Sequence, residues 1–169
     1  MSRAFVKEDG PDNTPLPDLP ISPHPNYVTL RGLAALRARL AEAQSRLAGL
    51  KARPERLDRN PERAAERDLR YLEARLASAI PVPAPAAPRE AAFATAVTVA
   101  DDAGRETTYE ITGEDEADAS LGRIAPQSPL ARALLGAVPG DLVAWRRPAG
   151  TVTLEVIGIA PLGQDEAAG

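Results

Sequence analysis

The chain contains no cysteine among its 169 residues, so disulfides and thiolate metal sites are excluded. Its only histidine, His24, lies in a proline-rich stretch without a second histidine nearby, which argues against a metal site or a histidine base. Aromatic residues make up only 4% of the sequence, while 12 glycines and 17 prolines interrupt it. A single large core is therefore not expected, and two small modules fit better.

Long apolar segments are also missing. No run approaches the roughly 18 apolar residues that a membrane span requires. The N-terminal sequence MSRAFVKEDG lacks the apolar stretch of a signal peptide. Together with the absence of cysteine, these features predict a cytoplasmic protein without a membrane segment.

The net charge of −4 combines two regions of opposite sign. Residues 31–79 hold 12 Lys and Arg against 7 Asp and Glu, which gives +5, whereas residues 89–160 hold 6 against 11, which gives −5. A basic module of this kind suits nucleic acid or an acidic protein surface. The plainer alternative is that these arginines only solvate a helical hairpin.

The first 26 residues are rich in proline and poor in large apolar side chains. They contain six prolines, so they bury too little surface to offset the entropy of ordering. We expect residues 1–26 to form a disordered arm.

Two heptad patterns follow the arm. Thr29 is a suitable cap for a helix over residues 30–51, and Asn60 followed by Pro61 is a good start for a second helix. The apolar positions are spaced alternately by three and four residues; they are Leu33, Leu36, Leu40, Ala43, Leu47 and Leu50 in the first helix and Ala65, Leu69, Leu72, Leu76 and Ala79 in the second. We predict an antiparallel coiled-coil hairpin over residues 27–80. The same seams would also suit a dimer.

A change of period marks a second module. Residues 81–88, PVPAPAAP, predict a stiff linker, after which apolar residues alternate in strands near 93–99, 107–111, 141–146 and 152–159. Ser128 and Pro129 open a short helix that ends at Gly136. The prediction is an α+β protein in which the hairpin precedes a small antiparallel sheet with one helix over residues 89–161, followed by a tail over 162–169.

Three segments carry a resemblance to a known family. TYEITGEDEAD, GRIAPQSPLARALLG and GDLVAWRRPAGTVTLEVIGI resemble the C-terminal domain of the GreA/GreB transcript cleavage factors of bacterial RNA polymerase. YVTLRGLAALRARL resembles the opening of their N-terminal coiled coil, and the likeness covers residues 26–160. It implies an FKBP-like C-terminal domain that docks on the rim of the polymerase secondary channel.

The resemblance also implies a mechanism. In the family, the coiled-coil finger enters the channel, and an Asp and a Glu in a tip motif D-L-S-E-N-A-E-Y help the polymerase to hold a second magnesium ion. It further implies that the chain is not itself an enzyme, has no cofactor of its own, works as a monomer on the polymerase core, and meets nucleic acid only indirectly.

The tip of the predicted hairpin, ARPERLDRNPERAAER over residues 52–67, departs from that motif. If Asn60 matches the motif's Asn, the two functional acids fall on Arg56 and Arg59; if YLEARL is matched instead, the motif is absent. Asp58 and Glu62 remain near the tip. Asp58 is read either as a replacement acid or, as we favour, as a turn residue that accepts a backbone N–H.

Other residues are candidates for docking. Glu114, Asp115, Glu116 and Asp118 form an acidic run, and the resemblance makes Asp115 and Asp118 contact candidates. Gln127, Ser128 and Pro129 occupy the family's segment for docking on the rim, although Ser128 and Pro129 also suit a simple helix start. An FKBP-like fold raises prolyl isomerisation too, but Phe93, Tyr109 and Trp145 are too few to line such a pocket.

We therefore expect an RNA polymerase-binding regulator that occupies the secondary channel without a cleavage acid pair, like the Gre-like proteins with shortened fingers such as the regulator of nucleoside diphosphate kinase. One alternative is an active cleavage factor that uses Asp58 and Glu62. Another is a coiled-coil adaptor with no role at the polymerase.

Overall fold

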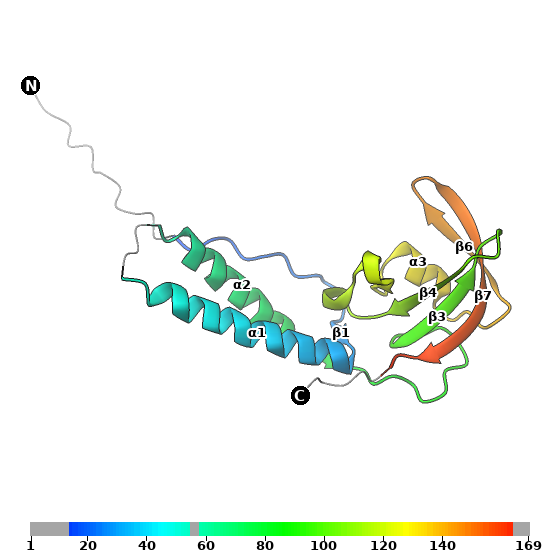
Figure 1. Ribbon diagram of the computed structural model, residues 1–169, viewed down its shortest axis with the longest axis horizontal. Coiled ribbons are helices and arrows are strands. Elements are labelled where there is room, and N and C mark those ends of the chain that lie inside the picture. The colour runs from blue at the N-terminus through cyan, green and yellow to red at the C-terminus, as the bar shows by residue number, and fades with distance from the viewer. Residues whose placement is uncertain (1–13, 55–57, 164–169) are drawn as a thin grey trace, which may run out of the picture.

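The computed structural model describes residues 14–54 and 58–163. It shows a long helical hairpin joined end-on to a compact α+β domain (Figure 1). The hairpin consists of α1 (Leu30–Lys51) and α2 (Asn60–Ala77). Within the described ranges, no helix has the length and hydrophobicity to cross a membrane.

The hairpin closes along the predicted seams. Leu36, Leu47, Ala65 and Leu72 are buried between the two helices, with the remaining seam residues packed around them. Thr29 caps α1, since its hydroxyl accepts the N–H of Gly32 at 2.9 Å. The predicted bounds of α1 are confirmed.

The base of the hairpin is fastened by a pairing that the sequence did not reveal. Strand β1 (Tyr27–Val28) runs parallel to β2 (Ile80–Pro81), and the N–H of Val82 donates to the carbonyl of Val28 at 2.9 Å. The predicted linker over 81–88 therefore begins inside the base of the hairpin. Two-residue strands have too few positions to show a period.

The C-terminal domain is a five-stranded sheet in the order β5-β4-β3-β7-β6. Its strands are β3 (Thr95–Ala100), β4 (Glu106–Ile111), β5 (Arg123–Ile124), β6 (Leu142–Arg147) and β7 (Gly150–Pro161). The sheet is mainly antiparallel, as the sequence predicts; only the two-residue pairing of β4 with β5 is parallel.

One helix covers the core side of this sheet. Helix α3 (Pro129–Leu134) begins where the hydroxyl of Ser128 accepts the N–H of Ala131 at 3.2 Å, as the sequence predicts. Its buried Leu130 and Leu134 pack in one cluster with strand residues that alternate along the chain, among them Val97, Val99, Ile111, Val143, Leu154 and Val156. Between β4 and β5 lie two 3₁₀ turns, η1 (Glu114–Glu116) and η2 (Ala119–Leu121).

Both predicted terminal segments need correction. Residues 14–26 are not a free arm, because they lie along α2 and bond to it, while residues 1–13 fall outside the described part of the chain. In the predicted tail, Leu162 is buried and its N–H donates to the carbonyl of Ala94 at 3.0 Å. A proline-rich segment does not readily form a helix or a strand, but it can still dock on another element in an extended conformation.

Candidate functional site

Among the described residues of the hairpin tip, which exclude Glu55, the acids do not gather. Asp58 is exposed, and its Oδ1 accepts the N–H of Asn60 at 2.9 Å, so it is a turn residue as favoured from the sequence. Glu62 points inward instead: its side chain is 5% exposed and its Oε2 lies 3.8 Å from Nε of Arg59. Arg56 lies outside the described residues.

The start of α2 differs slightly from the prediction. Asn60 is the first helical residue rather than the cap, and the capping position falls on Arg59, whose side chain makes no capping bond. Instead, the carboxylate of Asp58 accepts a hydrogen bond from the N–H of Asn60. A shift of one residue at a helix end is ordinary, and Pro61 still lies in the first turn as expected.

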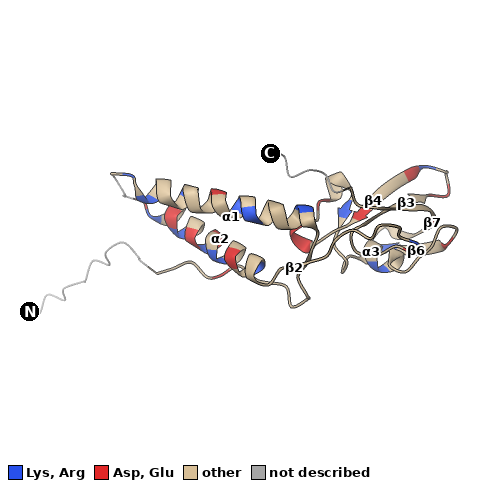
Figure 2. Cartoon of the chain, turned by 90° about the horizontal axis from the view of Figure 1, so that it is seen from below, with Lys and Arg blue, Asp and Glu red and all other residues tan. Residues whose placement is uncertain are grey.

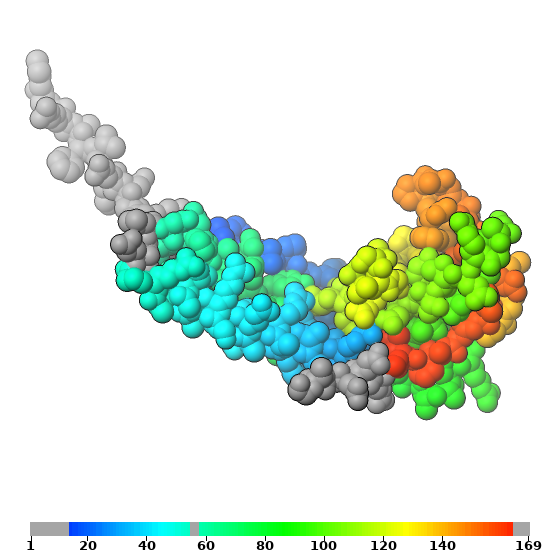
Figure 3. Space-filling view, viewed as in Figure 1, coloured from blue at the N-terminus to red at the C-terminus, as the bar shows by residue number. Residues whose placement is uncertain are grey.

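Acidic side chains pair with partners from the hairpin elsewhere, where the hairpin meets the C-terminal domain. Ten residues from both parts form what we call the junction network; they are Asn26, Thr29, Arg31, Tyr71, Arg75, Glu110, Glu114, Asp115, Glu116 and Arg123. In the space-filling view, the η1–η2 segment lies directly against the start of the hairpin (Figure 3).

The centre of the junction network is Arg75 of α2. Its Nε donates to Oδ2 of Asp115 at 2.6 Å, and its Nη2 donates to Oδ1 of Asn26 at 2.6 Å. Nη2 also lies 3.4 Å from Oε2 of Glu114. The side chains of Arg75 and Asp115 are 2% and 8% exposed, so a charge left alone there would be costly.

Tyr71 adds a second bond to the same acid. Its hydroxyl donates to Oδ1 of Asp115 at 2.9 Å. Burial, that hydrogen bond and the negative charge of Asp115 together raise the pKa of Tyr71. Asp115, proposed from the sequence as a docking contact, is thus turned inward and engaged on both oxygens.

Glu116 binds the N-terminus of α1. Its carboxylate accepts the hydroxyl of Thr29 at 2.6 Å and the backbone N–H groups of Thr29 and Gly113 at 3.2 Å each. A carboxylate is favoured there by the helix dipole and by the unsatisfied N–H groups. Gly32 makes the approach possible, because a Cβ at that position would overlap the Glu116 carboxyl group.

Glu110 joins α1 to β5. It accepts Nη2 of Arg31 at 2.7 Å and Nε of Arg123 at 3.1 Å. Burial alone would raise the pKa of Glu110, but the two arginines outweigh it and lower the pKa overall. The network could not be predicted from the sequence, because an acidic run and a basic hairpin do not show which acid pairs with which residue of the hairpin. The helical Gly32 and the capping Thr29 were its only local signals.

The segment predicted for docking lies on the C-terminal domain away from the junction. Pro129 is exposed, Gln127 and Ser128 are half-buried, and Ser128 caps α3. Three large apolar side chains are also exposed between the end of α3 and the start of β6, namely Leu135, Val138 and Leu142. Asp118 is exposed too, and the hydrogen bonds from Ser120 lower its pKa.

The aromatic residues do not form one pocket. Tyr109 and Trp145 meet edge-on at 6.4 Å in a cavity of about 360 Å³, with Arg147 over the indole at 5.0 Å. Phe93 lies instead against Tyr27 at 6.0 Å. Across residues 14–54 and 58–163, no three His, Asp or Glu residues lie together as a metal ion would require.

Comparison with known proteins gives concordant matches. Residues 86–161 match the family described as transcription elongation factor, GreA/GreB, C-terminal. The chain is 41% identical over 95 residues to transcription elongation factor GreA of Pseudomonas aeruginosa, covering 54% of this chain and 60% of that protein. It is 42% identical over 100 residues to GreA of Xanthomonas campestris, covering 57% and 63%.

These alignments span about three fifths of the relatives' length. Among solved structures, GreA factor homolog 1 of Thermus thermophilus is 22% identical, with 81% of this chain and 99% of that chain covered and a TM-score of 0.40.

Proposed function

We propose that the chain is a transcription elongation regulator of the GreA/GreB family that occupies the secondary channel of bacterial RNA polymerase. In this proposal, the C-terminal domain docks on the channel rim and the hairpin fills part of the channel. The hairpin supplies no acid pair, so transcript cleavage is not stimulated. The chain acts on the polymerase and is not itself an enzyme.

The geometry of the tip carries this proposal. A second magnesium ion needs carboxylate oxygens that converge on it. Asp58 is committed to the turn, Glu62 is buried, and Arg59 lies between them in the sequence. At the same end of the hairpin, Lys51 pairs with Glu66 at 2.9 Å, which occupies a further acid.

The surface around α3 supports the docking half of the proposal. It combines an exposed Pro129 with the apolar side chains of Leu135, Val138 and Leu142, and Leu142 is 70% exposed. Exposed apolar groups on a domain with a complete core are typical of interaction sites. Asp118 stays in the proposed surface, whereas Asp115 is withdrawn from it because it serves the junction network.

Binding of the full chain to core RNA polymerase tests the docking. Gln127→Glu combined with Pro129→Glu places two charges on the proposed surface and keeps the Ser128 cap. We expect affinity to fall by about tenfold or more, which corresponds to about 1.4 kcal/mol. Thr151→Glu, at the exposed start of β7, is the matched control and should bind normally. Equal binding by a folded double variant would place the docking surface elsewhere.

The exposed carboxylate of Asp58 favours one second candidate, an active cleavage factor. A cleavage assay on backtracked complexes separates the two functions. An adaptor without a role at the polymerase would instead show no polymerase binding, and its mass by light scattering would report self-association through the hairpin.

A further inference from the structure

The segment before the hairpin docks as an extended strand with one face inward. Residues 14–26 run along α2 from the tip end of the hairpin toward the domain junction (Figure 1). Leu16, Leu19 and Ser22 are half-buried, while the residues between them are exposed. A repeat of three is the period of polyproline II, and the five prolines of this segment favour that form.

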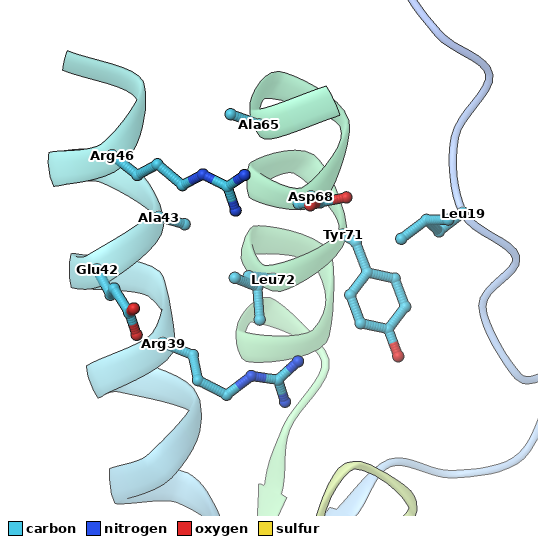
Figure 4. A pocket seen from close by; sticks show the side chains of 9 residues that line it. All are labelled: Leu19, Arg39, Glu42, Ala43, Arg46, Ala65, Asp68, Tyr71 and Leu72. Carbon is cyan, nitrogen blue, oxygen red and sulfur yellow. The ribbon is translucent and has the colours of Figure 1, made fainter. Parts of the chain in front are cut away.

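Specific contacts hold this segment, which we call the strap. Arg70 of α2 donates from Nε to Oδ1 of Asp18 at 2.6 Å and from Nη2 to the carbonyl of Leu16 at 2.8 Å. Ser22 donates to Oε1 of Glu114 at 2.8 Å. Leu19 forms one wall of a groove of about 410 Å³, which α2 and α1 complete with residues that include Ala65, Tyr71, Leu72 and Ala43 (Figure 4).

These contacts specify the position of the strap but hold it weakly. The Asp18 side chain is 74% exposed, and an ion pair in water contributes little. Only two leucines are covered, and both are half-buried. Segments with few buried contacts open far more readily than the fold itself, so the strap is a releasable element.

Charge also matches the strap to the hairpin. The strap, residues 14–26, carries one acid, Asp18, and no Lys or Arg, whereas residues 31–79 carry +5. Lys and Arg residues are spread along both helices, with acidic residues interspersed (Figure 2). The strap occupies one of these cations, Arg70, which another partner of the finger would otherwise meet.

We propose that the outer face of α2 is a docking surface for an extended, acidic, proline-containing segment, and that the chain's own strap occupies it to mask the finger. A third layer thickens the hairpin, so the strap must leave before the finger enters a narrow channel. This step rests on the proposed function. Release of the strap therefore favours binding to RNA polymerase.

Two single substitutions separate this effect from a general charge effect. Leu19→Asp places a charge at the inward position, whereas Ile21→Asp adds the same charge two residues away on a side chain that is 48% exposed. Because the chain has no cysteine, a spin label on Pro17→Cys reports docking through broadening of α2 amide signals in NMR spectra. We expect Leu19→Asp to abolish the broadening and Ile21→Asp to retain it.

Core polymerase binding then tests the masking. Leu19→Asp, and a chain lacking residues 1–21, should bind several-fold more tightly than the intact chain, and Ile21→Asp should bind equally. A synthetic peptide of residues 12–21 should weaken binding of the shortened chain again. Equal or weaker binding after release overturns the mask. If no form binds polymerase, the masking fails together with the proposed function, while the spin label still decides whether the strap docks on α2.

Discussion

Arg75 of α2 and Asp115 of η1 meet as a buried ion pair, with Nε and Oδ2 2.6 Å apart and side chains 2% and 8% exposed. The pair joins two segments forty residues apart in sequence and connects the hairpin to the C-terminal domain. Because Asn26, Tyr71 and Glu114 bond to the same two side chains, the contact has one specific geometry. It sets the direction in which the hairpin leaves the domain.

Breaking this pair should be costly. Arg75→Met leaves Asp115 buried without its cation, and removal of one partner of a buried pair typically costs about 3–5 kcal/mol. Adding Asp115→Leu to the same chain should restore part of the loss, because no orphaned charge remains. Urea unfolding followed by circular dichroism measures both. A loss below about 1 kcal/mol for the single variant, which is usual for exposed pairs, would contradict a buried role.

Replacing two glycines of α1 by alanine should change the stability of the protein in opposite directions. At Gly32 an added Cβ would displace the Glu116 carboxylate from the helix N-terminus, and the loss of such a capping interaction typically costs about 1 kcal/mol. At Gly49 the added Cβ meets nothing within 4 Å, so Gly49→Ala should stabilise the helix by about 0.5–1 kcal/mol. Thermal unfolding of the two variants makes the comparison. Stabilisation by both would show that Glu116 does not depend on Gly32.

Glu110 should make the junction sensitive to acid. Its pKa is lower in the folded protein than its ordinary value of 4.5, despite the opposing effect of burial. A depressed carboxyl pKa contributes stability that is complete above the unfolded value and is lost as the pH falls through the folded value. The free energy of unfolding should therefore decrease on acidification from about pH 4.5 downward.

Glu110→Gln should flatten that acid dependence and lower stability at pH 7, because Arg31 and Arg123 lose the charge that they share. Glu106→Gln removes one charge from the exposed start of the same strand and serves as the control at pH 7. Unfolding titrations at several pH values provide the measurement. If the free energy of unfolding of Glu110→Gln fell on acidification as steeply as that of the intact chain, another group would be responsible for the acid sensitivity.

Asp58 should matter for the turn and not for chemistry. Asp58→Ala removes the acceptor for the Asn60 N–H at an exposed helix start, and such changes typically cost about 0.5–2 kcal/mol. The loss should appear as a lower melting temperature, with polymerase binding unchanged. Asp58→Asn, which keeps an acceptor oxygen, should recover most of the stability. Equal melting temperatures for the intact chain, Asp58→Ala and Asp58→Asn would show that Asp58 does not stabilise the turn.

Local patterns predicted much of this fold. The α1 bounds, both seams, the Thr29 and Ser128 caps and the turn role of Asp58 depend on neighbours a few residues away, so the sequence displays them. The junction network does not, because Arg75 resembles any solvated arginine of a hairpin until Asp115 is placed beside it. The acidic run was accordingly predicted to face a partner, whereas three of its four acids face the hairpin.

The strap shows a second limit. Low hydrophobicity predicted disorder for residues 1–26, yet residues 14–26 dock on α2 through Leu16 and Leu19 at a spacing of three and through the bonds of Arg70. That periodicity is visible in the sequence, but it acquires meaning only when Arg70 and Tyr71 are known to lie opposite.

Cleavage of backtracked RNA by purified polymerase, with the intact chain and Asp58→Ala compared side by side, distinguishes channel occupancy from stimulation of cleavage. Carboxylates that do not converge cannot hold a second magnesium ion, and nearby arginines oppose its approach. We predict that neither chain stimulates cleavage and that both compete with an authentic cleavage factor for the polymerase. Robust cleavage with the intact chain that disappears in Asp58→Ala would contradict the occupancy account and establish a cleavage factor.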